Sequence, residues 1–309
     1  MDRRFLIALI WVFSSSVSFA ASSNNRLPLD SKWIAENVNK AYALSWMPVE
    51  CLNPSAGKMA DLGRLLFESP ALLGGQAARM GLSCSSCHPS GRTNPNFFIR
   101  GVSSTKGTAD VKESFFSSNG GDQHFHAVTI PDLADRNQTK IVNRNSREFR
   151  DKIRELVQVE FDGQAASIKV IDALQNYLAN TDLSFCVDPQ MKKDIDLMQD
   201  WQRLLETIEF IEQAIVDGHE KHFVLLVRVA RQLLGKIYHR YGILDDESID
   251  QNIIESSRKI ESLASADLKN RTLLLEQWYE HATILFLRLK ETESKSGYSE
   301  DDLEHYLDK

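Results

Sequence analysis

The sequence predicts a mainly α-helical protein in two parts: a first domain with a long irregular segment, then an all-helical domain. Three observations predict this fold. Apolar residues recur at helical spacing over most of the chain, whereas residues 89–135 are rich in Ser, Gly, Asn and Pro and show no sustained period. From Lys192 onward the composition shifts to Leu, Ile, Glu, Lys and Arg, and no strand signal exceeds a few residues.

The first twenty residues have the pattern of a secretory signal peptide. Arg3 and Arg4 precede an apolar run over residues 5–13, and small residues lead to Ala20. An uncleaved membrane anchor is the alternative, but the apolar run is shorter than the roughly 20 residues that a spanning helix needs. We therefore expect cleavage after Ala20, a periplasmic location, and no membrane span in the mature chain.

Residues 21–188 form the predicted first domain. Helical patterns cover residues 30–46, 58–68, 146–161 and 164–180, and Pro70 ends the second of them. The long irregular segment lies between the second and third patterns. Because long ordered loops in compact domains usually carry function, we expect residues 89–135 to contribute to a site.

Residues 189–309 form the predicted second domain. Helical patterns cover residues 190–216, 220–241, 248–264 and 266–292, with short turns such as 216–218 and 241–242 between them. Helices joined by short turns are typical of an up-and-down bundle, so we expect these segments to pack as an all-helical bundle. The His residues on these patterns are read as solvated or satisfied structural residues.

The motif that carries chemistry is Cys84-Ser85-Ser86-Cys87-His88. Two thiols three positions apart can add to the two vinyl groups of a haem, and the adjacent imidazole can then reach the iron. A small disulfide or half of a metal site is the alternative, but the remaining cysteines do not supply the second pair of ligands that a zinc site needs. The sequence therefore predicts one covalently bound haem c, with His88 as the proximal ligand.

Two cysteines remain outside this motif, Cys51 and Cys186. Disulfides persist in an exported protein, so we expect these two residues to be bonded and to close the first domain. Two separately buried thiols are the alternative.

The flanks of the motif resemble the diheme cytochrome c peroxidase and MauG-like family, in which an LGxxLFxDxxLS segment precedes SCxxCH. The matching segments here are LGRLLFESPAL (62–72), SCSSCH (83–88), VTIPDL (128–133, with Asp132 at the family's usual Ser) and ALQNYL (173–178). The resemblance spans about residues 55–182. It implies a cytochrome c-like haem domain for the first part of the chain.

This chain also departs from the pattern of that family. Family members carry two CxxCH motifs, whereas this chain has one, so the resemblance implies a form reduced to a single haem. Peroxide reduction takes two electrons, and a lone haem would need a partner haem or a Trp or Tyr radical to supply the second. The family's distal Gly-His pattern is also absent, although His124 and His126 lie in the equivalent loop.

Several other residues could act on a haem at His88. Either His126 or His124 could be the sixth ligand, with Met80, Met59, water or no ligand as alternatives. Arg92 and Arg100 could pair with haem propionates, although surface positions are the simpler interpretation. Trp33 and Trp46 could pack on the porphyrin edge, but their spacing indicates core positions first.

Charge and motif together define the expected function. The net charge of −7 becomes about −8 when the signal peptide removes a net +1, which argues against a nucleic-acid partner. An acidic surface suits docking of a basic redox partner protein, and it also simply maintains solubility. We expect an exported electron-transfer cytochrome. A peroxidase-like haem oxidoreductase with a second electron source is the alternative, so enzymatic activity stays open, and a sensor with a structural haem is a third hypothesis.

Overall fold

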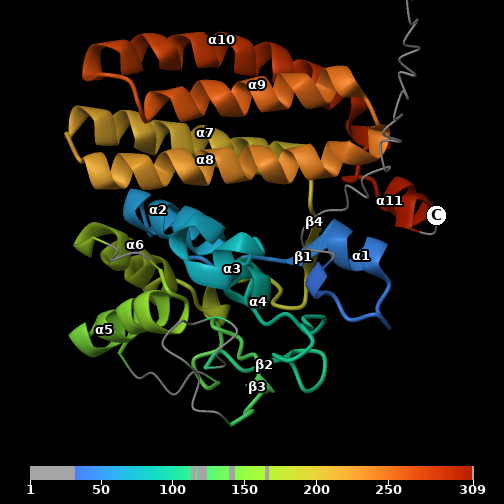
Figure 1. Cartoon of the computed structure of the whole chain (residues 1–309). Helices are drawn as coiled ribbons and strands as arrows, with labels where there is room; N and C mark the ends of the chain where they lie inside the picture. Colours follow the sequence, from blue (N-terminus) through green and yellow to red (C-terminus); the bar gives the residue numbers. More distant parts are fainter. Residues whose placement is uncertain (1–31, 113–115, 117–123, 139–142, 164–166, 308–309) are drawn as a thin grey trace, which may run out of the picture.

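The computed structural model describes residues 32–112, 116, 124–138, 143–163 and 167–307. The predicted signal peptide, residues 1–20, lies outside these residues. The described chain is mainly helical, as the sequence predicts, and its helices form two layers (Figure 1). Among the described residues, no helix combines the length and apolar composition needed to cross a membrane.

The C-terminal layer is a bundle of antiparallel helices that follow one another in sequence (Figure 1). Its members are α7 (Leu197–Val216), α8 (Glu220–Tyr241), α9 (Glu247–Leu263) and α10 (Leu268–Thr292). Aspartates at positions 196, 246 and 267 cap α7, α9 and α10, because their carboxylates accept backbone N–H groups of the first turn. The four helical patterns predicted after residue 190 are thus confirmed, with the first beginning later than expected.

The other layer is centred on α2 (Lys58–Glu68) and α6 (Ile168–Ala179), which pack against each other. They approach closely at Gly63, where an added Cβ atom would lie 2.0 Å from the carbonyl oxygen of Ala173. Only glycine allows this approach. Helix α5 (Arg147–Glu155) also contacts α6 and continues as a wider helical turn over Leu156–Glu160.

Short elements carry the motif and the loop beyond it. Helix α3 (Gly75–Arg79) leads to α4 (Cys84–Cys87), and single 3₁₀ turns cover Pro70–Leu72 and Pro89–Gly91. The irregular segment contains two two-residue strands, β2 (Thr108–Ala109) and β3 (Val128–Thr129), which pair with each other. The described part of residues 89–135 is otherwise irregular, as predicted.

The helix predicted over residues 30–46 is wrong. Only α1 (Lys40–Ser45) is α-helical, and Asn39 caps it by accepting the backbone N–H of Tyr42. The preceding residues follow the irregular segment instead, since Ala35 donates its N–H to Asn96 and Trp33 accepts one from Phe98. Their apolar spacing therefore reflects burial against a distant loop.

Two contacts join residues 40–48 to later parts of the chain. Strand β1 (Trp46–Pro48) pairs antiparallel with β4 (Lys192–Asp194), and α1 packs against α11 (Glu300–Leu307), a helix that the sequence analysis missed. The predicted boundary at residues 188/189 lies just before β4. The buried apolar core is continuous across both layers, from Leu62 and Leu174 to Leu204 and Leu234.

Candidate functional site

The Cys84–His88 motif occupies one helical turn and the residue that follows it. The backbone N–H of Ser83 donates to Ser86 Oγ at 3.0 Å, and the N–H of His88 donates to the carbonyl of Cys84 at 2.9 Å. These bonds fix the start and the end of the turn. The turn therefore presents both thiols and the imidazole from one short, constrained segment.

The two thiols of the motif are free, whereas the other two cysteines are bonded. Both side chains pack against the main apolar core. Burial raises the pKa of Cys84 and of Cys87 to about 12, so both are neutral thiols at ordinary pH. The turn thus holds two thiols, three positions apart, that are not joined in a disulfide.

The imidazole of His88 is held in its neutral form. Burial lowers its pKa to about 4, although the carbonyl of Pro131 and the carboxylate of Asp132 act in the opposite direction. Its Nδ1 atom is buried and has no hydrogen-bond partner within the described part of the chain, and the backbone of Pro131 lies near the ring. A neutral imidazole is the form that binds a metal.

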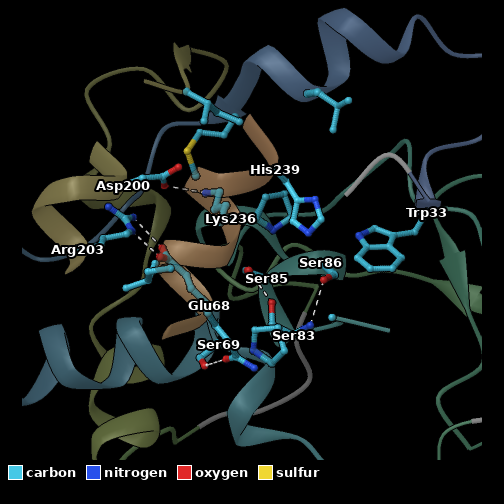
Figure 2. A pocket seen from close by; sticks show the side chains of 18 of the residues that line it. Trp33, Glu68, Ser69, Ser83, Ser85, Ser86, Asp200, Arg203, Lys236 and His239 are labelled. Carbon is cyan, nitrogen blue, oxygen red and sulfur yellow. Dashed lines mark hydrogen bonds and ion pairs between the residues drawn. The ribbon is translucent and has the colours of Figure 1, made fainter. Parts of the chain in front are cut away.

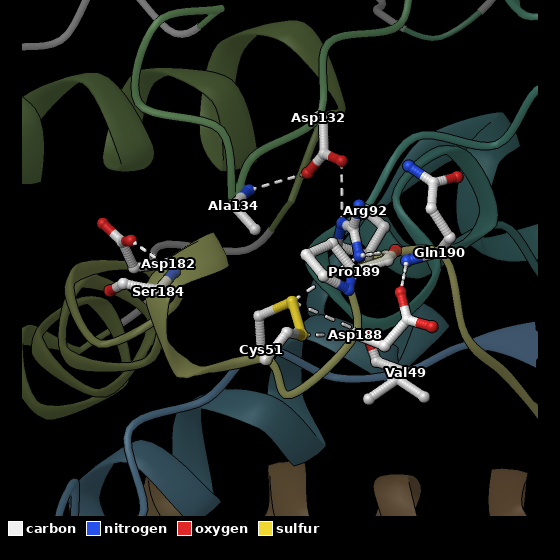
Figure 3. Close-up of a disulfide and its surroundings, with 11 residues drawn as sticks. Val49, Cys51, Arg92, Asp132, Ala134, Asp182, Ser184, Asp188, Pro189 and Gln190 are labelled. Atoms are coloured by element: carbon white, nitrogen blue, oxygen red, sulfur yellow. Dashed lines mark hydrogen bonds and ion pairs between the residues drawn. A yellow bond between two sulfur atoms is a disulfide. The ribbon is translucent and has the colours of Figure 1, made fainter.

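A buried ion pair supports the loop beside His88. Arg92 is only 9% exposed, and its Nε atom donates to Asp132 Oδ2 at 2.7 Å (Figure 3). Its Nη1 atom donates to the carbonyl of Pro189 at 3.0 Å and lies 3.5 Å from Cys51 Sγ. The surface position expected for Arg92 is therefore wrong, whereas Arg100 is exposed.

The structure joins Cys51 to Cys186, as predicted, with Cα atoms 4.7 Å apart. Figure 3 shows Arg92 between this disulfide and Asp132. The loop that faces His88 contains Asp132. Through Arg92 this loop is connected to the segments that carry the disulfide. The resemblance marked residues 128–133 as a segment, but the pairing of Arg92 with Asp132 has no sequence signal because the partners are 40 positions apart.

The two candidate distal histidines lie in the loop before β3. Both His124 and His126 are exposed, and their rings stack on each other with centroids 5.9 Å apart. The backbone N–H of His126 donates to Asp110 Oδ2 at 2.6 Å, which anchors the loop to the segment after β2. The identity of a sixth ligand stays a prediction.

The remaining candidate residues, which are tryptophans, methionines and bundle histidines, have contacts that support the fold or lie on the surface. Trp33 is buried in the main core, and Trp46 donates its indole N–H to Glu300 Oε2 at 2.8 Å. Met80 packs against the core and Met59 is exposed. His281 contacts the carbonyl of Asn252, in keeping with a satisfied bundle histidine.

The donor set of the motif fits a covalently attached porphyrin. No cluster of three or more His, Cys, Asp or Glu side chains arranged for a metal ion occurs in the described ranges. In a c-type haem, only the imidazole binds the metal, while the two thiols bond to the ring periphery. Free thiols at Cys84 and Cys87, with the neutral imidazole of His88 next to them, provide these three groups.

Comparisons with protein-family models, with curated protein sequences and with solved structures find no match to this chain. The resemblance to the diheme cytochrome c peroxidase and MauG-like family therefore depends on the four sequence segments alone. In the structure, two of these segments pack together, since α2 contains most of the first and α6 contains the last.

Proposed function

We propose that this protein is an exported c-type cytochrome that carries one haem on Cys84 and Cys87 and transfers single electrons. The observation that supports it most directly is the state of the motif. Two free, half-buried thiols and a neutral imidazole lie in one turn and the residue after it, while the other cysteines form a disulfide. The helical first domain would then be a cytochrome c-like domain related to the family that its motifs resemble.

Each residue of the site has a defined role in this proposal. The sulfur atoms of Cys84 and Cys87 would form thioethers, and His88 would bind the iron through the ring nitrogen opposite Nδ1. The Pro131 carbonyl would accept the Nδ1 proton and so fix the orientation of the ring. When bound, the haem supplies a one-electron redox centre.

The surroundings of the site support an electron carrier. The chain is acidic overall, which suits a basic redox partner protein and disfavours nucleic acid. The Cys51–Cys186 disulfide suits a periplasmic location. Arg92 is already bonded to Asp132 and Pro189, so it holds the loop in place and is not reserved for a haem propionate.

Covalent haem attachment is tested by expression of the full chain with a c-type maturation system. A pyridine haemochrome assay should give one haem per chain, retained through acid-acetone extraction. Cys84→Ser and Cys87→Ser should each reduce the covalent haem, and Ser85→Ala is the matched control within the same turn. Complete extraction of the haem from the unmodified protein would overturn the proposal.

Whether a side chain binds the iron on the face opposite His88 distinguishes electron transfer from peroxidase-like activity. A carrier with a bound sixth ligand should be low-spin in both oxidation states and should react slowly with carbon monoxide and peroxide. Substitution of a ligating His126 or His124 by Gly should produce a high-spin spectrum. Rapid carbon monoxide binding and peroxide-driven dye oxidation by the unmodified protein would instead establish the enzyme.

A further inference from the structure

A cleft of about 780 Å³ lies between the two layers of the molecule. Its walls include the outer face of the motif turn, with Ser83, Ser85 and Ser86, and one face of α8, with Lys236 and His239 (Figure 2). Neither thiol nor His88 lines this cleft. Its lining thus leaves out the three groups that would hold the haem and includes only other residues of the motif turn.

The charge of the cleft wall is opposite to that of the whole protein. Its described lining residues include seven Lys or Arg side chains but only two acidic ones, Glu68 and Asp200. Both acids are already engaged, because Glu68 pairs with Arg203 and Asp200 pairs with Lys236 at 2.8 Å. Arg231 pairs with Glu261 outside the lining. The lining as a whole still carries more positive than negative side chains, in a protein of net charge −7.

Two buried donors on the wall lack partners. Ser90 is 2% exposed and Arg240 is 1% exposed, yet Ser90 Oγ and Arg240 Nε form no hydrogen bond within the described ranges. Buried polar groups are nearly always satisfied, so an unsatisfied one needs an explanation. Both atoms can donate a hydrogen bond, and an acceptor-rich ligand in the cleft would supply the partners.

Space for a ligand is built into α8. Gly235 lies in the interior of this 22-residue helix, where glycine is less stable than alanine. An added Cβ atom would meet nothing within 4 Å, so packing within the protein does not require glycine here. Gly235 lines the cleft one turn before His239, and the space beside it is open.

We propose that this cleft binds an organic anion with an apolar ring system. The cationic wall and the two unsatisfied donors would bind its carboxylate or sulfonate group. The ring system would pack on the apolar part of the wall, which includes Trp33, Leu65 and Val229. This inference does not depend on the haem, because the motif contributes only its serine face.

Isothermal titration calorimetry of the full chain with anilinonaphthalene sulfonate tests this site. We expect one binding site per chain. N-phenylnaphthylamine, which has the same rings without the sulfonate, should bind about tenfold more weakly because it cannot use the cationic wall. Absence of saturable binding, or several equivalent sites, would overturn the proposal, and equal affinity for the neutral compound would overturn the anionic assignment.

Variants then locate the bound probe. Arg228→Glu should weaken the affinity by about tenfold, whereas Arg258→Glu, the same charge reversal on an exposed position of α9, should change it by less than about twofold. Gly235→Leu should abolish saturable binding, and Gly235→Ala should keep the chain folded with an intermediate affinity. Thermal unfolding checks that each variant is folded. Unchanged affinity in folded Arg228→Glu and Gly235→Leu would show that the probe binds elsewhere.

Discussion

At the residue scale, the environment of His88 comes mostly from a distant loop. Pro131 and Asp132 follow His88 by more than forty positions, yet they face its ring, and Arg92 holds Asp132 in place. Asp132 also accepts the backbone N–H of Ala134 at 2.9 Å, so one carboxylate fixes both the loop and the guanidinium. Hydrogen bonds from Thr93 to Ile130 and from Asp132 to Gln138 also hold this loop, and the ion pair with Arg92 adds a buried charged contact to them.

Asp132→Asn should destabilise the fold, because it leaves the Arg92 guanidinium buried without its counter-charge. Loss of one partner of a buried ion pair costs about 3–5 kcal/mol. Urea unfolding of the variant should show a decrease of this size in the free energy of unfolding. Asp194→Asn on the exposed strand β4 is the control and should change it by less than about 0.5 kcal/mol. Equal values for the two variants would contradict the role of Asp132.

At the element scale, two glycines in helix interiors should respond to alanine in opposite directions. Gly63→Ala places a Cβ atom 2.0 Å from a carbonyl oxygen of α6, so we expect a loss of more than about 3 kcal/mol from forced separation of α2 and α6. Gly235→Ala meets open space and should add about 0.5–1 kcal/mol. Thermal and urea unfolding measure the change in unfolding free energy for each variant. Destabilisation by Gly235→Ala would contradict the open space beside Gly235 of α8.

The layers are joined by an ion pair that makes stability depend on pH. Burial alone would raise the pKa of Glu68, but the paired Arg203 guanidinium of α7 holds it below its ordinary value of 4.5. The pair therefore stabilises the fold fully above pH 4.5, and this contribution is lost as the pH falls through the lower folded pKa.

Glu68→Gln tests this pair. Near neutral pH the variant should lose about 3 kcal/mol of unfolding free energy, since Arg203 stays buried without its partner. The difference from the unmodified protein should shrink steadily below pH 4.5, which urea titrations at several pH values would measure. Lys58→Gln breaks the exposed pair with Glu209 and is the control, with little effect at any pH. A difference that is constant down to pH 2 would contradict the assignment.

At the scale of the whole molecule, the disulfide spans 135 positions and constrains the unfolded chain. A closed loop of about 100 residues corresponds to roughly 4.7 kcal/mol in the chain-entropy account. The double variant Cys51→Ala, Cys186→Ala should therefore lower the free energy of unfolding by about 3–5 kcal/mol. Chemical denaturation under non-reducing conditions measures this loss. Treatment of the unmodified protein with a reductant should cause the same loss of unfolding free energy. A loss below about 1 kcal/mol would contradict the stabilising role of the disulfide.

The sequence predicts what is encoded locally. The bundle helices are recognisable because each has its own apolar period, and three have an aspartate cap. Helix α11 escapes notice because Leu303 is its one fully buried residue among those described. The helix predicted over residues 30–46 does not form along its whole length, because the apolar spacing there has another cause. Trp33 and Ala35 pack beside residues 96–98 of the irregular segment.

The candidate site also has features that the local sequence encodes and features that it does not. The motif Cys84–His88 is contiguous and visible in the sequence, and the disulfide follows from the two cysteines left over. The Arg92–Asp132 pair and the cleft wall on α8 depend on which distant segments meet, and no local spacing records that. From sequence alone, Arg92 is expected on the surface, but in the structure it is buried and bonded to Asp132 of the distant loop.

The pairing of Cys51 with Cys186 also has a consequence for the order of assembly. The disulfide joins the first cysteine of the chain to the last, and both motif thiols lie between them. As the chain is synthesised, Cys51 meets Cys84 and Cys87 before its own partner exists. A chain oxidised too early would therefore trap Cys51 on the motif, so haem attachment at Cys84 and Cys87 would also remove the two competitors for the native bond.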